Sequence, residues 1–415
     1  MLAQRPRFRG LVAVVRVPSE LRHDLAHDGF HVSEDAREAA TLPPGAFTEE
    51  AFLRAELATL FRQSWVLIPL RSGPDTREDL RSLADLVARR GARAPFTMLD
   101  RPLFLQRDWQ GKLRAFPNVC THAWHTLVQG PDRSKTLACP QHGRQFDAQG
   151  RCLGQQGFEE CKGFPGPEDH LQAFEVAAWG PLLFASLGAP VRPAKEVLGP
   201  VQESLGSLPF EHFQRRTFAG EVREVEGNWK QHVWNYLDAM HIPYVHRKPG
   251  GLAEAVDMPS YRTEVHGEAV LQWVYARDPA LGFDPEVLPA RFRDAGGRRV
   301  FALWWFVFPN LALNFYPWGL SVNLWMPVPG RPQRTLFFWH HLVGDEAKYA
   351  HADEAWLLRT VDDEDVDALA QVARGVRSGF APRGRFAAQG EEGPHWFHRK
   401  VEQAVFGCDG AAPGG

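Results

Sequence analysis

The chain has 415 residues, of which 44% are hydrophobic and 23% are charged, and its net charge is −3 with a pI near 6.6. This composition is ordinary for a globular protein of two or three domains. It excludes a strongly basic nucleic-acid binder, and no apolar run in the sequence approaches the roughly 20 residues that span a bilayer. We therefore expect no nucleic-acid partner and no membrane partner.

The N-terminus begins with an Arg-rich segment without acidic residues, MLAQRPRFRGLVAVVRV. Transit peptides have such a composition, but we favour a partly disordered N-terminal extension over residues 1–46. Residues 49–62 have apolar side chains at helical spacing, and Thr48 is a suitable N-cap. We assign residues 47–64 to a helix that packs on a later domain.

Residues 65–188 alternate short apolar runs with Gly, Pro and Asp, a pattern typical of short antiparallel strands. This region contains Cys120-Thr-His122 and Cys139-Pro-Gln-His142, which we place in loops between strands. Two thiolates and two imidazoles in paired loops suit a [2Fe–2S] cluster in which His replaces Cys on one iron, and such a cluster transfers single electrons. A structural zinc site is the alternative.

The other cysteines are Cys152, Cys161 and Cys408. An odd number at irregular spacing argues against a disulfide framework. An iron–sulfur protein with spare thiols fits a reducing compartment, so we expect the protein in the cytoplasm.

The second half of the chain predicts a domain over residues 189–407, followed by a disordered tail at 408–415. Residues 189–207, with Pro190, Pro193 and Pro200, look like a connection. Residues 301–343 contain four runs rich in β-branched and aromatic side chains, which predict a large antiparallel sheet. Residues 228–246 and 363–376 predict helices. The fold class is therefore α+β.

A second metal site is indicated by His241 and His246, which lie five positions apart. On an ideal helix this spacing turns the side chains about 140° apart. Pro243 disfavours helix at Ile242, and a helix that ends or bends there would bring both imidazoles toward one point. Two His and one carboxylate form the facial triad of non-heme Fe(II) oxygenases. The carboxylate could come from any of five acidic residues near the start of the late helix, although acidic residues there also suit the helix dipole: Asp362, Asp363, Glu364, Asp365 and Asp367.

Four stretches together carry a family resemblance. They are CTH…CPQHG, Asn228-Trp-Lys230, Asn235-Tyr-Leu-Asp238-x-x-His241-x4-His246, and Glu364-Asp365 at the start of a helix. From about residue 30 to residue 406 the chain resembles the catalytic (alpha) subunit of Rieske non-heme iron oxygenases. The stretch NLALNFYPWGLSVNLWMPV, residues 310–328, also resembles the choline monooxygenase and betaine demethylase branch of this family. The resemblance implies an all-β Rieske domain over residues 65–188 and a helix-grip-like catalytic domain over residues 189–407.

The resemblance also implies roles for individual residues. Cys120, His122, Cys139 and His142 would bind the [2Fe–2S] cluster, and His241, His246 and Asp365 would bind mononuclear Fe(II). Asp238 matches the carboxylate that bridges the two metal centres, across neighbouring subunits of a homotrimer. Asn235 either lines the iron pocket or packs as an ordinary helix residue. The chain departs from the family pattern at three positions beside these groups: Ala123, Arg144 and Met240.

The expected function is that of a terminal oxygenase. An NAD(P)H-dependent reductase or a ferredoxin would supply electrons, and O2 would be used to hydroxylate or oxidatively demethylate a small substrate. A quaternary amine is one candidate, because Trp faces attract cations, and an aromatic ring is the other. Aromatic residues in a sheet are usually core, and alternation places only half of them on one face. A non-catalytic electron carrier would predict a degraded iron site, whereas the set here is complete. The aromatic residues concerned are Trp304, Trp305, Phe306, Phe308, Phe315, Tyr316, Trp318 and Trp325.

Overall fold

The computed structural model of the chain describes residues 29–70, 83–216, 221–354 and 360–407. Cys408 and the tail predicted at 408–415 therefore lie outside the described residues, as do residues 1–28 of the predicted N-terminal extension. Residues 29–46 pack into the main core, where Phe30, Val32 and Leu42 are buried. Among the described helices, none has both the length and the apolar character that a bilayer crossing requires.

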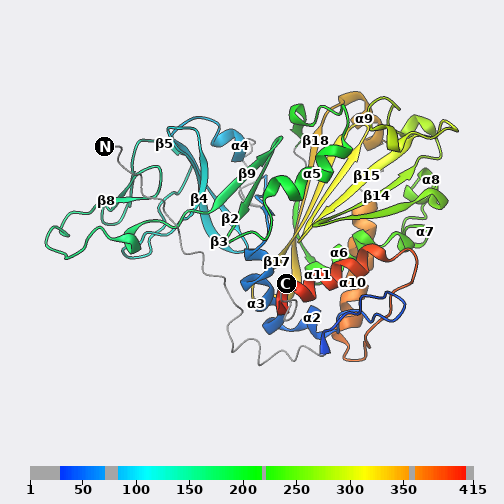
Figure 1. Ribbon diagram of the computed structural model, residues 1–415, viewed down its shortest axis with the longest axis horizontal. Coiled ribbons are helices and arrows are strands. Elements are labelled where there is room, and N and C mark those ends of the chain that lie inside the picture. Colours follow the sequence, from blue (N-terminus) through cyan, green and yellow to red (C-terminus); the bar gives the residue numbers. More distant parts are fainter. Residues whose placement is uncertain (1–28, 71–82, 217–220, 355–359, 408–415) are drawn as a thin grey trace, which may run out of the picture.

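The first lobe consists of short antiparallel strands, as the sequence predicts (Figure 1). A four-stranded sheet has the order β4-β3-β2-β5, and two three-stranded sheets have the orders β6-β7-β8 and β1-β10-β9. The strands are β1 Val66–Leu67, β2 Ala92–Met98, β3 Arg101–Arg107, β4 Leu113–Pro117, β5 Asp132–Arg133, β6 Leu137–Ala138, β7 Gln145–Phe146, β8 Cys152–Gly154, β9 Glu175–Trp179 and β10 Leu182–Ser186.

The second lobe is built on an eight-stranded antiparallel sheet. Its order is β11-β18-β17-β16-β15-β14-β13, and β12 also pairs with β18. The four aromatic runs predicted as strands are β15 to β18, so this prediction is confirmed. The strands are β11 Gln214–Arg216, β12 Val222–Glu226, β13 Arg262–His266, β14 Ala269–Tyr275, β15 Val300–Val307, β16 Leu311–Tyr316, β17 Gly319–Val328 and β18 Arg331–Val343.

Helices α6, α10 and α11 lie together against one face of this sheet (Figure 1). Side chains on opposite faces of β15 show the alternation: Trp304 faces the helices, whereas the indole N–H of Trp305 donates to Ser204 of α5 on the other side (2.9 Å). The helices are α2 Gly45–Thr48, α3 Glu50–Ala58, α4 Leu83–Leu86, α5 Ala194–Ser204, α6 Trp229–Leu237, α7 Ile242–Val245, α8 Leu252–Ala255, α9 Glu346–Glu354, α10 Thr360–Arg377 and α11 Glu392–Phe406.

Two predictions about the helices are wrong in detail. Thr48 is the last residue of α2 rather than the N-cap of a helix over 49–62, and its hydroxyl donates to the Pro44 carbonyl (3.1 Å). The segment 189–207 is not a plain connection, because it contains α5. Pro193 is the N-cap of α5 and Pro200 lies inside it, while Val197, Leu198 and Val201 are buried. Burial of this apolar face outweighs the poor helix propensity of proline.

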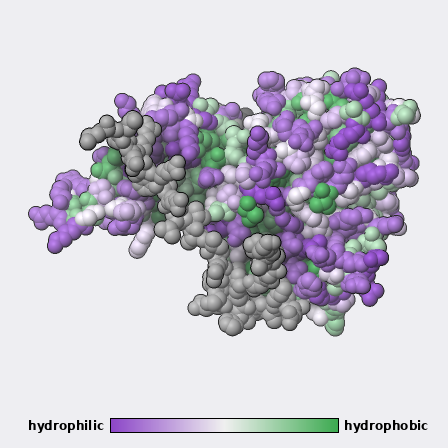
Figure 2. Space-filling model, viewed as in Figure 1, coloured by the Kyte–Doolittle hydropathy of each residue, from purple (hydrophilic) through white to green (hydrophobic). Residues whose placement is uncertain are grey.

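Hydrophobic residues form small separate patches among hydrophilic ones on the coloured part of the face that Figure 2 shows. Three strongly exposed aromatic residues of the described chain are Trp124, Tyr244 and Phe380. Two of these belong to the segments that contain the predicted metal ligands.

Candidate metal centres

The two Cys/His segments fold into loops of matching backbone geometry. The first loop, residues 120–125, follows β4, and the second, residues 139–144, joins β6 to β7. In each loop the cysteine N–H donates to the carbonyl five positions later, His125 in the first and Arg144 in the second, at 2.8 Å in both cases. The loops are therefore equivalent although the His follows the Cys at different spacings.

The fifth residue of each loop has a left-handed backbone. It is Trp124 in the first loop and Gly143 in the second, with φ of 61° and 71°. Each donates its N–H to the carbonyl of the loop's cysteine, at 3.1 and 2.9 Å. Glycine adopts this conformation without cost, whereas a bulky residue is strained there. Trp124 is also 81% exposed, so a strained tryptophan projects from the protein beside His122.

The four predicted cluster residues form two pairs across these loops, one of cysteines and one of histidines. Cys120 and Cys139 are buried free thiols. Burial raises the pKa of the Cys120 thiol, N–H groups of the following residues oppose the rise, and the Cys139 thiol adds to it. The rings of His122 and His142 meet edge-to-face with centroids 4.8 Å apart. Two neighbouring thiols and two imidazoles, with backbone N–H groups directed at sulfur, fit a [2Fe–2S] cluster.

Arg144 links the second loop to the first loop and to two segments that follow it in the chain. It is 2% exposed, and its guanidinium pairs with Asp169 (2.8 Å) and donates to Thr121 (3.0 Å) and Gln155 (2.8 Å). The amide nitrogen of Gln155 in turn lies 3.1 Å from Nδ1 of His122. The arginine that replaces the family's usual residue is thus the centre of a hydrogen-bond network that holds the first loop.

The second predicted site depends on a break in the helix over residues 228–246. Asn228 and Gln231 form a capping box that starts α6. Helix α6 ends at Asp238, which is extended (φ −93°, ψ 105°), and the Asp238 carboxylate accepts the Met240 N–H (2.7 Å) to cap the 3-10 turn Ala239–His241. The break therefore precedes the position predicted from Pro243, because Ile242 is helical and Pro243 lies within the first turn of α7.

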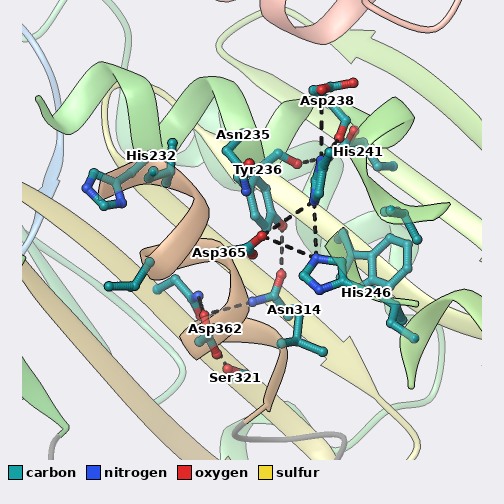
Figure 3. Close-up of a pocket in the computed structure, with 18 of the residues that line it drawn as sticks. His232, Asn235, Tyr236, Asp238, His241, His246, Asn314, Ser321, Asp362 and Asp365 are labelled. Atoms are coloured by element: carbon teal, nitrogen blue, oxygen red, sulfur yellow. Dashed lines mark hydrogen bonds and ion pairs between the residues drawn. The ribbon is translucent and has the colours of Figure 1, made fainter. Parts of the chain in front are cut away.

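This break brings His241 and His246 together, and α10 adds Asp365 (Figure 3). The two Nε2 atoms are 3.2 Å apart, and Oδ1 of Asp365 is 3.6 Å from His241 and 3.2 Å from His246. Of the five acidic candidates, Asp365 is the one that joins both histidines. The other four have different surroundings. Asp362 lines the neighbouring pocket and Asp363 pairs with Arg223. Glu364 contacts Nδ1 of His246, and Asp367 is exposed.

The donor set fits a bound metal. Nδ1 of His241 faces the Asp238 carbonyl, and Nδ1 of His246 is 2.8 Å from Glu364. Protons on both Nδ1 atoms leave two Nε2 lone pairs directed at each other, and Oδ1 of Asp365 is buried without a hydrogen-bond donor. Three close acceptors repel unless a cation lies between them. Two His and one carboxylate on one side, with the other side open to a pocket, suit non-heme Fe(II).

Burial and the neighbouring carboxylates act against each other on the pKa of both histidines, and the balance differs between them. Burial opposes protonation of His246, but Asp365 and Glu364 outweigh it and raise its pKa. Burial dominates at His241 and lowers its pKa, although Asp365 is also near. Lys248 holds the far oxygen of Glu364 (2.9 Å), so an ion pair supports the Glu364 contact with His246.

The Asp238 carboxylate does not contact the His241 ring directly, although Asp238 matches the carboxylate that bridges the two metal centres in the family. The carboxylate lies 3.9 Å from Nδ1 of His241, outside hydrogen-bond range, and the Asp238 carbonyl faces this nitrogen instead. The reason is local, since the carboxylate caps the 3-10 turn. Burial raises the Asp238 pKa, and the Met240 N–H and His241 oppose this rise.

A pocket opens from the triad between α6, α10 and the large sheet (Figure 3). Asn235 lines this pocket, which is the first of the two roles predicted for it, rather than packing as an ordinary helix residue. Three of the eight aromatic residues noted in the sequence also face it, namely Trp304, Tyr316 and Trp325. The remaining lining residues are His232, Tyr236, Asp238, His241, Ile242, His246, Leu252, Tyr261, Gln272, Asn314, Ser321, Asn323, Phe337, Val361, Asp362, Asp365, Val366 and Leu369.

Sequence reasoning missed a polar network in this pocket. The Tyr236 hydroxyl donates to Asn314 (2.7 Å), Asn314 donates to Asn323 (3.1 Å), and Asn323 donates to Asp362 (2.7 Å). A signal was present: Asn314, Ser321 and Asn323 are the polar residues of β16 and β17, at alternate positions that share one face. The role of Glu364 beside His246 was also missed, because it depends on how α10 packs.

Comparison with known families assigns both lobes. Residues 80–165 match the Rieske [2Fe–2S] domain, and residues 213–407 match the catalytic domain of the ring-hydroxylating alpha subunit. The chain belongs to the Rieske non-heme iron oxygenases. It therefore carries a Rieske [2Fe–2S] cluster and a mononuclear iron, and the α+β fold expected from the sequence is confirmed.

Individual relatives of this Rieske oxygenase are distant but extensive. The chain is 26% identical over 400 residues to chloroplastic choline monooxygenase of Beta vulgaris, covering 95% of this chain and 83% of that protein. The quaternary ammonium Rieske monooxygenase CntA, solved with its substrate L-carnitine, has a TM-score of 0.69 at 19% identity and covers 92% of this chain and 99% of its own. Naphthalene 1,2-dioxygenase from Rhodococcus sp. has a TM-score of 0.65 at 15% identity, covering 89% and 95%.

Proposed function

We propose that this Rieske oxygenase oxidises a small quaternary ammonium compound, by hydroxylation or oxidative demethylation. In this proposal Cys120, His122, Cys139 and His142 bind the cluster. His241, His246 and Asp365 bind the iron. The observation that carries the proposal is the position of the triad at the end of a pocket with aromatic walls and a carboxylate.

The pocket walls support a cationic substrate. Trp304, Tyr316 and Tyr261 form one aromatic wall, in which Tyr261 stacks on Trp304 with centroids 5.9 Å apart. Tyr236 and Trp325 form another, with centroids 5.5 Å apart. Aromatic faces attract a desolvated ammonium group. The names of the relatives agree with this chemistry, since choline and carnitine are both quaternary ammonium compounds.

The chain's own residues prepare the site. The Asp238 carbonyl and the Glu364 carboxylate hold protons on Nδ1 of His241 and His246, so both Nε2 atoms are directed at the metal position. Iron held there by His241, His246 and Asp365 would supply the activation of O2. The aromatic walls would hold the substrate beside the triad and exclude water.

We propose a homotrimer in which the cluster of one copy serves the iron of its neighbour, with Asp238 between the two centres. Exposure supports this arrangement on both sides. His142 and Trp124 are exposed at the cluster. Beside the proposed iron ligand His241, Met240 is 49% and Tyr244 is 77% exposed, so this segment presents two large hydrophobic side chains that a neighbouring copy would cover. A reductase or ferredoxin would supply the electrons.

Two further assignments belong to the proposal. The division into a Rieske domain at 65–188 and a catalytic domain at 189–407 encloses both matched regions, residues 80–165 and 213–407. A cytoplasmic location is supported by the free thiols of Cys152 and Cys161.

The test is substrate-dependent O2 consumption by the holoenzyme with a surrogate reductase. We expect consumption with at least one of choline, L-carnitine and glycine betaine, and formation of an oxidised or demethylated product. The control variant is His246→Ala, which should retain the cluster but consume no substrate. Turnover of indole or naphthalene with none of the three amines would replace this proposal by the second candidate, ring oxidation, which the fold shared with naphthalene 1,2-dioxygenase and the aromatic walls favour.

A further inference from the structure

Helix α10 begins with four consecutive acidic residues that point to four different surroundings. Asp363 is 61% exposed and pairs with Arg223 (2.6 Å). Glu364 pairs with Lys248 (2.9 Å) and His246 (2.8 Å). Asp365 joins the histidine triad. Each of these three carboxylates therefore has a cationic or metal-binding partner.

Asp362 is the exception. Within the described part of the chain it forms no ion pair, and its one hydrogen-bond donor is the Asn323 amide (2.7 Å). Arg223 is the cation that influences it most, but this guanidinium pairs with Asp363 and lies over the rings of Phe337 and Trp339, 5.5 and 6.0 Å from their centroids. Asp362 is therefore left to face the pocket.

Leaving such a carboxylate without a partner is unfavourable. Asp362 is half-buried and lines the pocket, and the burial of its surroundings, with the nearby Asp365 charge, raises its pKa to about 7. A buried charge normally has a compensating charge or several donors. Three other residues of α10 that line the pocket are apolar, namely Val361, Val366 and Leu369.

The surroundings of Asp362 have the properties of a site for an organic cation. The Asp362 charge contributes to the raised pKa of both Tyr236 and Tyr316, so it lies close to the two aromatic walls. The polar network from Tyr236 through Asn314 and Asn323 ends on its carboxylate. A pocket with aromatic walls and a carboxylate that has no ion-pair partner favours a bulky cation that brings no hydrogen-bond donors.

We propose that Asp362 is the specificity-determining residue of the pocket, and that it recognises the positive charge of the substrate while the aromatic walls enclose its alkyl groups. This inference rests on the proposed function, which it deepens by naming the group that distinguishes a quaternary ammonium compound from a neutral one of the same shape. Asn323 acts through Asp362 as a positioning residue, because its amide orients the carboxylate.

The test uses two ligands of nearly identical shape. Choline and 3,3-dimethylbutan-1-ol differ in a quaternary nitrogen against a quaternary carbon, so their affinities isolate the charge. We would measure both by calorimetry under anaerobic conditions, on the iron-loaded, full-length protein. The wild type should bind choline at least about 10-fold more tightly than the alcohol, as expected for a desolvated charge pair. Asp362→Asn should remove this preference and leave the affinity for the alcohol within about twofold.

The matched control is Asp363→Asn, which removes the same charge one position along α10 on the exposed side. It should keep the preference for choline. Iron content and binding of the alcohol report whether Asp362→Asn retains its structure. If that variant does not fold, Asp362→Ser, which removes the same charge with a smaller side chain, replaces it in the same comparison.

Each contrary outcome has a distinct meaning. Equal wild-type affinities for choline and the alcohol would overturn the inference whatever the variants do. An unchanged preference in Asp362→Asn would overturn it and leave the proposed function standing. Loss of iron with equal weakening of both ligands would overturn it too, since Asp362 would then support the metal rather than the substrate. A wild type that binds no quaternary ammonium compound would overturn both the inference and the proposed substrate class.

Discussion

The two metal regions of the chain are built in opposite ways. The cluster loops draw their four residues from positions 120 to 142, and two loops of equal backbone geometry present them. The iron triad joins a broken helix at positions 238–246 to α10, more than a hundred residues later. A site made by local loops can be recognised from spacing, whereas a site made by packed helices depends on the whole domain. Variants in each region should therefore fail differently.

The largest effect is expected from Asp365→Ala. Removing the carboxylate leaves two histidines, and two neutral ligands hold Fe(II) poorly. We expect the variant to retain the cluster, lose the mononuclear iron and show no substrate-dependent turnover. Iron and sulfide analysis would measure this as a fall from three irons to about two per chain. Loss of the cluster as well would mean that the cluster loops depend on the iron site, contrary to the view that the two regions are built independently.

Asp367→Ala is the matched control, because Asp367 is an exposed acid on the same helix. It should retain all three irons. If Asp367→Ala instead lost the mononuclear iron, the assignment of Asp365 as the ligand would be wrong.

The next largest effect is expected from Asp238→Asn. Its carboxylate caps the 3-10 turn before His241 and would connect the two centres between copies. An asparagine oxygen can still accept the Met240 N–H, so both metals should remain while the coupling between them suffers. We expect reductase-driven turnover to fall about 100-fold, the upper range for groups that support metal ligands. Stopped-flow reoxidation of the reduced cluster would measure this step, and an unchanged rate would remove Asp238 from the electron path.

The contrast between local loops and packed helices also explains which features could be predicted from the sequence. The cluster residues and the large sheet follow from spacing and from β-branched and aromatic runs, which are local. The two histidines were found from the DxxHx4H stretch, but the sequence predicted the break in the helix at Pro243. The helix breaks earlier, at Asp238, because the Asp238 carboxylate caps the next turn. Helix α5 was missed because Pro193 and Pro200 argue against a helix in the sequence, whereas burial of its apolar face stabilises one. The choice of Asp365 over its neighbours came from the family resemblance, since only the packing of α10 separates four adjacent acids.

A smaller effect is expected at the cluster from Arg144→Met. The substitution preserves length but removes the cation from Asp169 and the donors from Thr121 and Gln155. The cost should be about 1–3 kcal/mol of local stability. The visible absorbance of the cluster should disappear at a lower temperature than in the wild type, while the mononuclear iron stays bound. Arg151→Met is the control, because Arg151 is 67% exposed and pairs with Asp147 on the surface. Equal thermal loss in both variants would contradict a special role for Arg144.

The smallest effect is expected from Glu364→Gln at the iron. Glutamine can still accept the Nδ1–H of His246, so the ring keeps its orientation, but the negative charge that makes the imidazole a stronger ligand is gone. Iron affinity should fall about 10-fold, the lower range for such partners, and competition with a chelator would measure it. Lys248→Met should change the affinity less than twofold, because Lys248 is 65% exposed and acts on His246 only through Glu364. If Glu364→Gln bound iron as tightly as the wild type, helix packing alone would orient His246. The iron site would then resemble the cluster loops, in which backbone geometry sets the ligand positions.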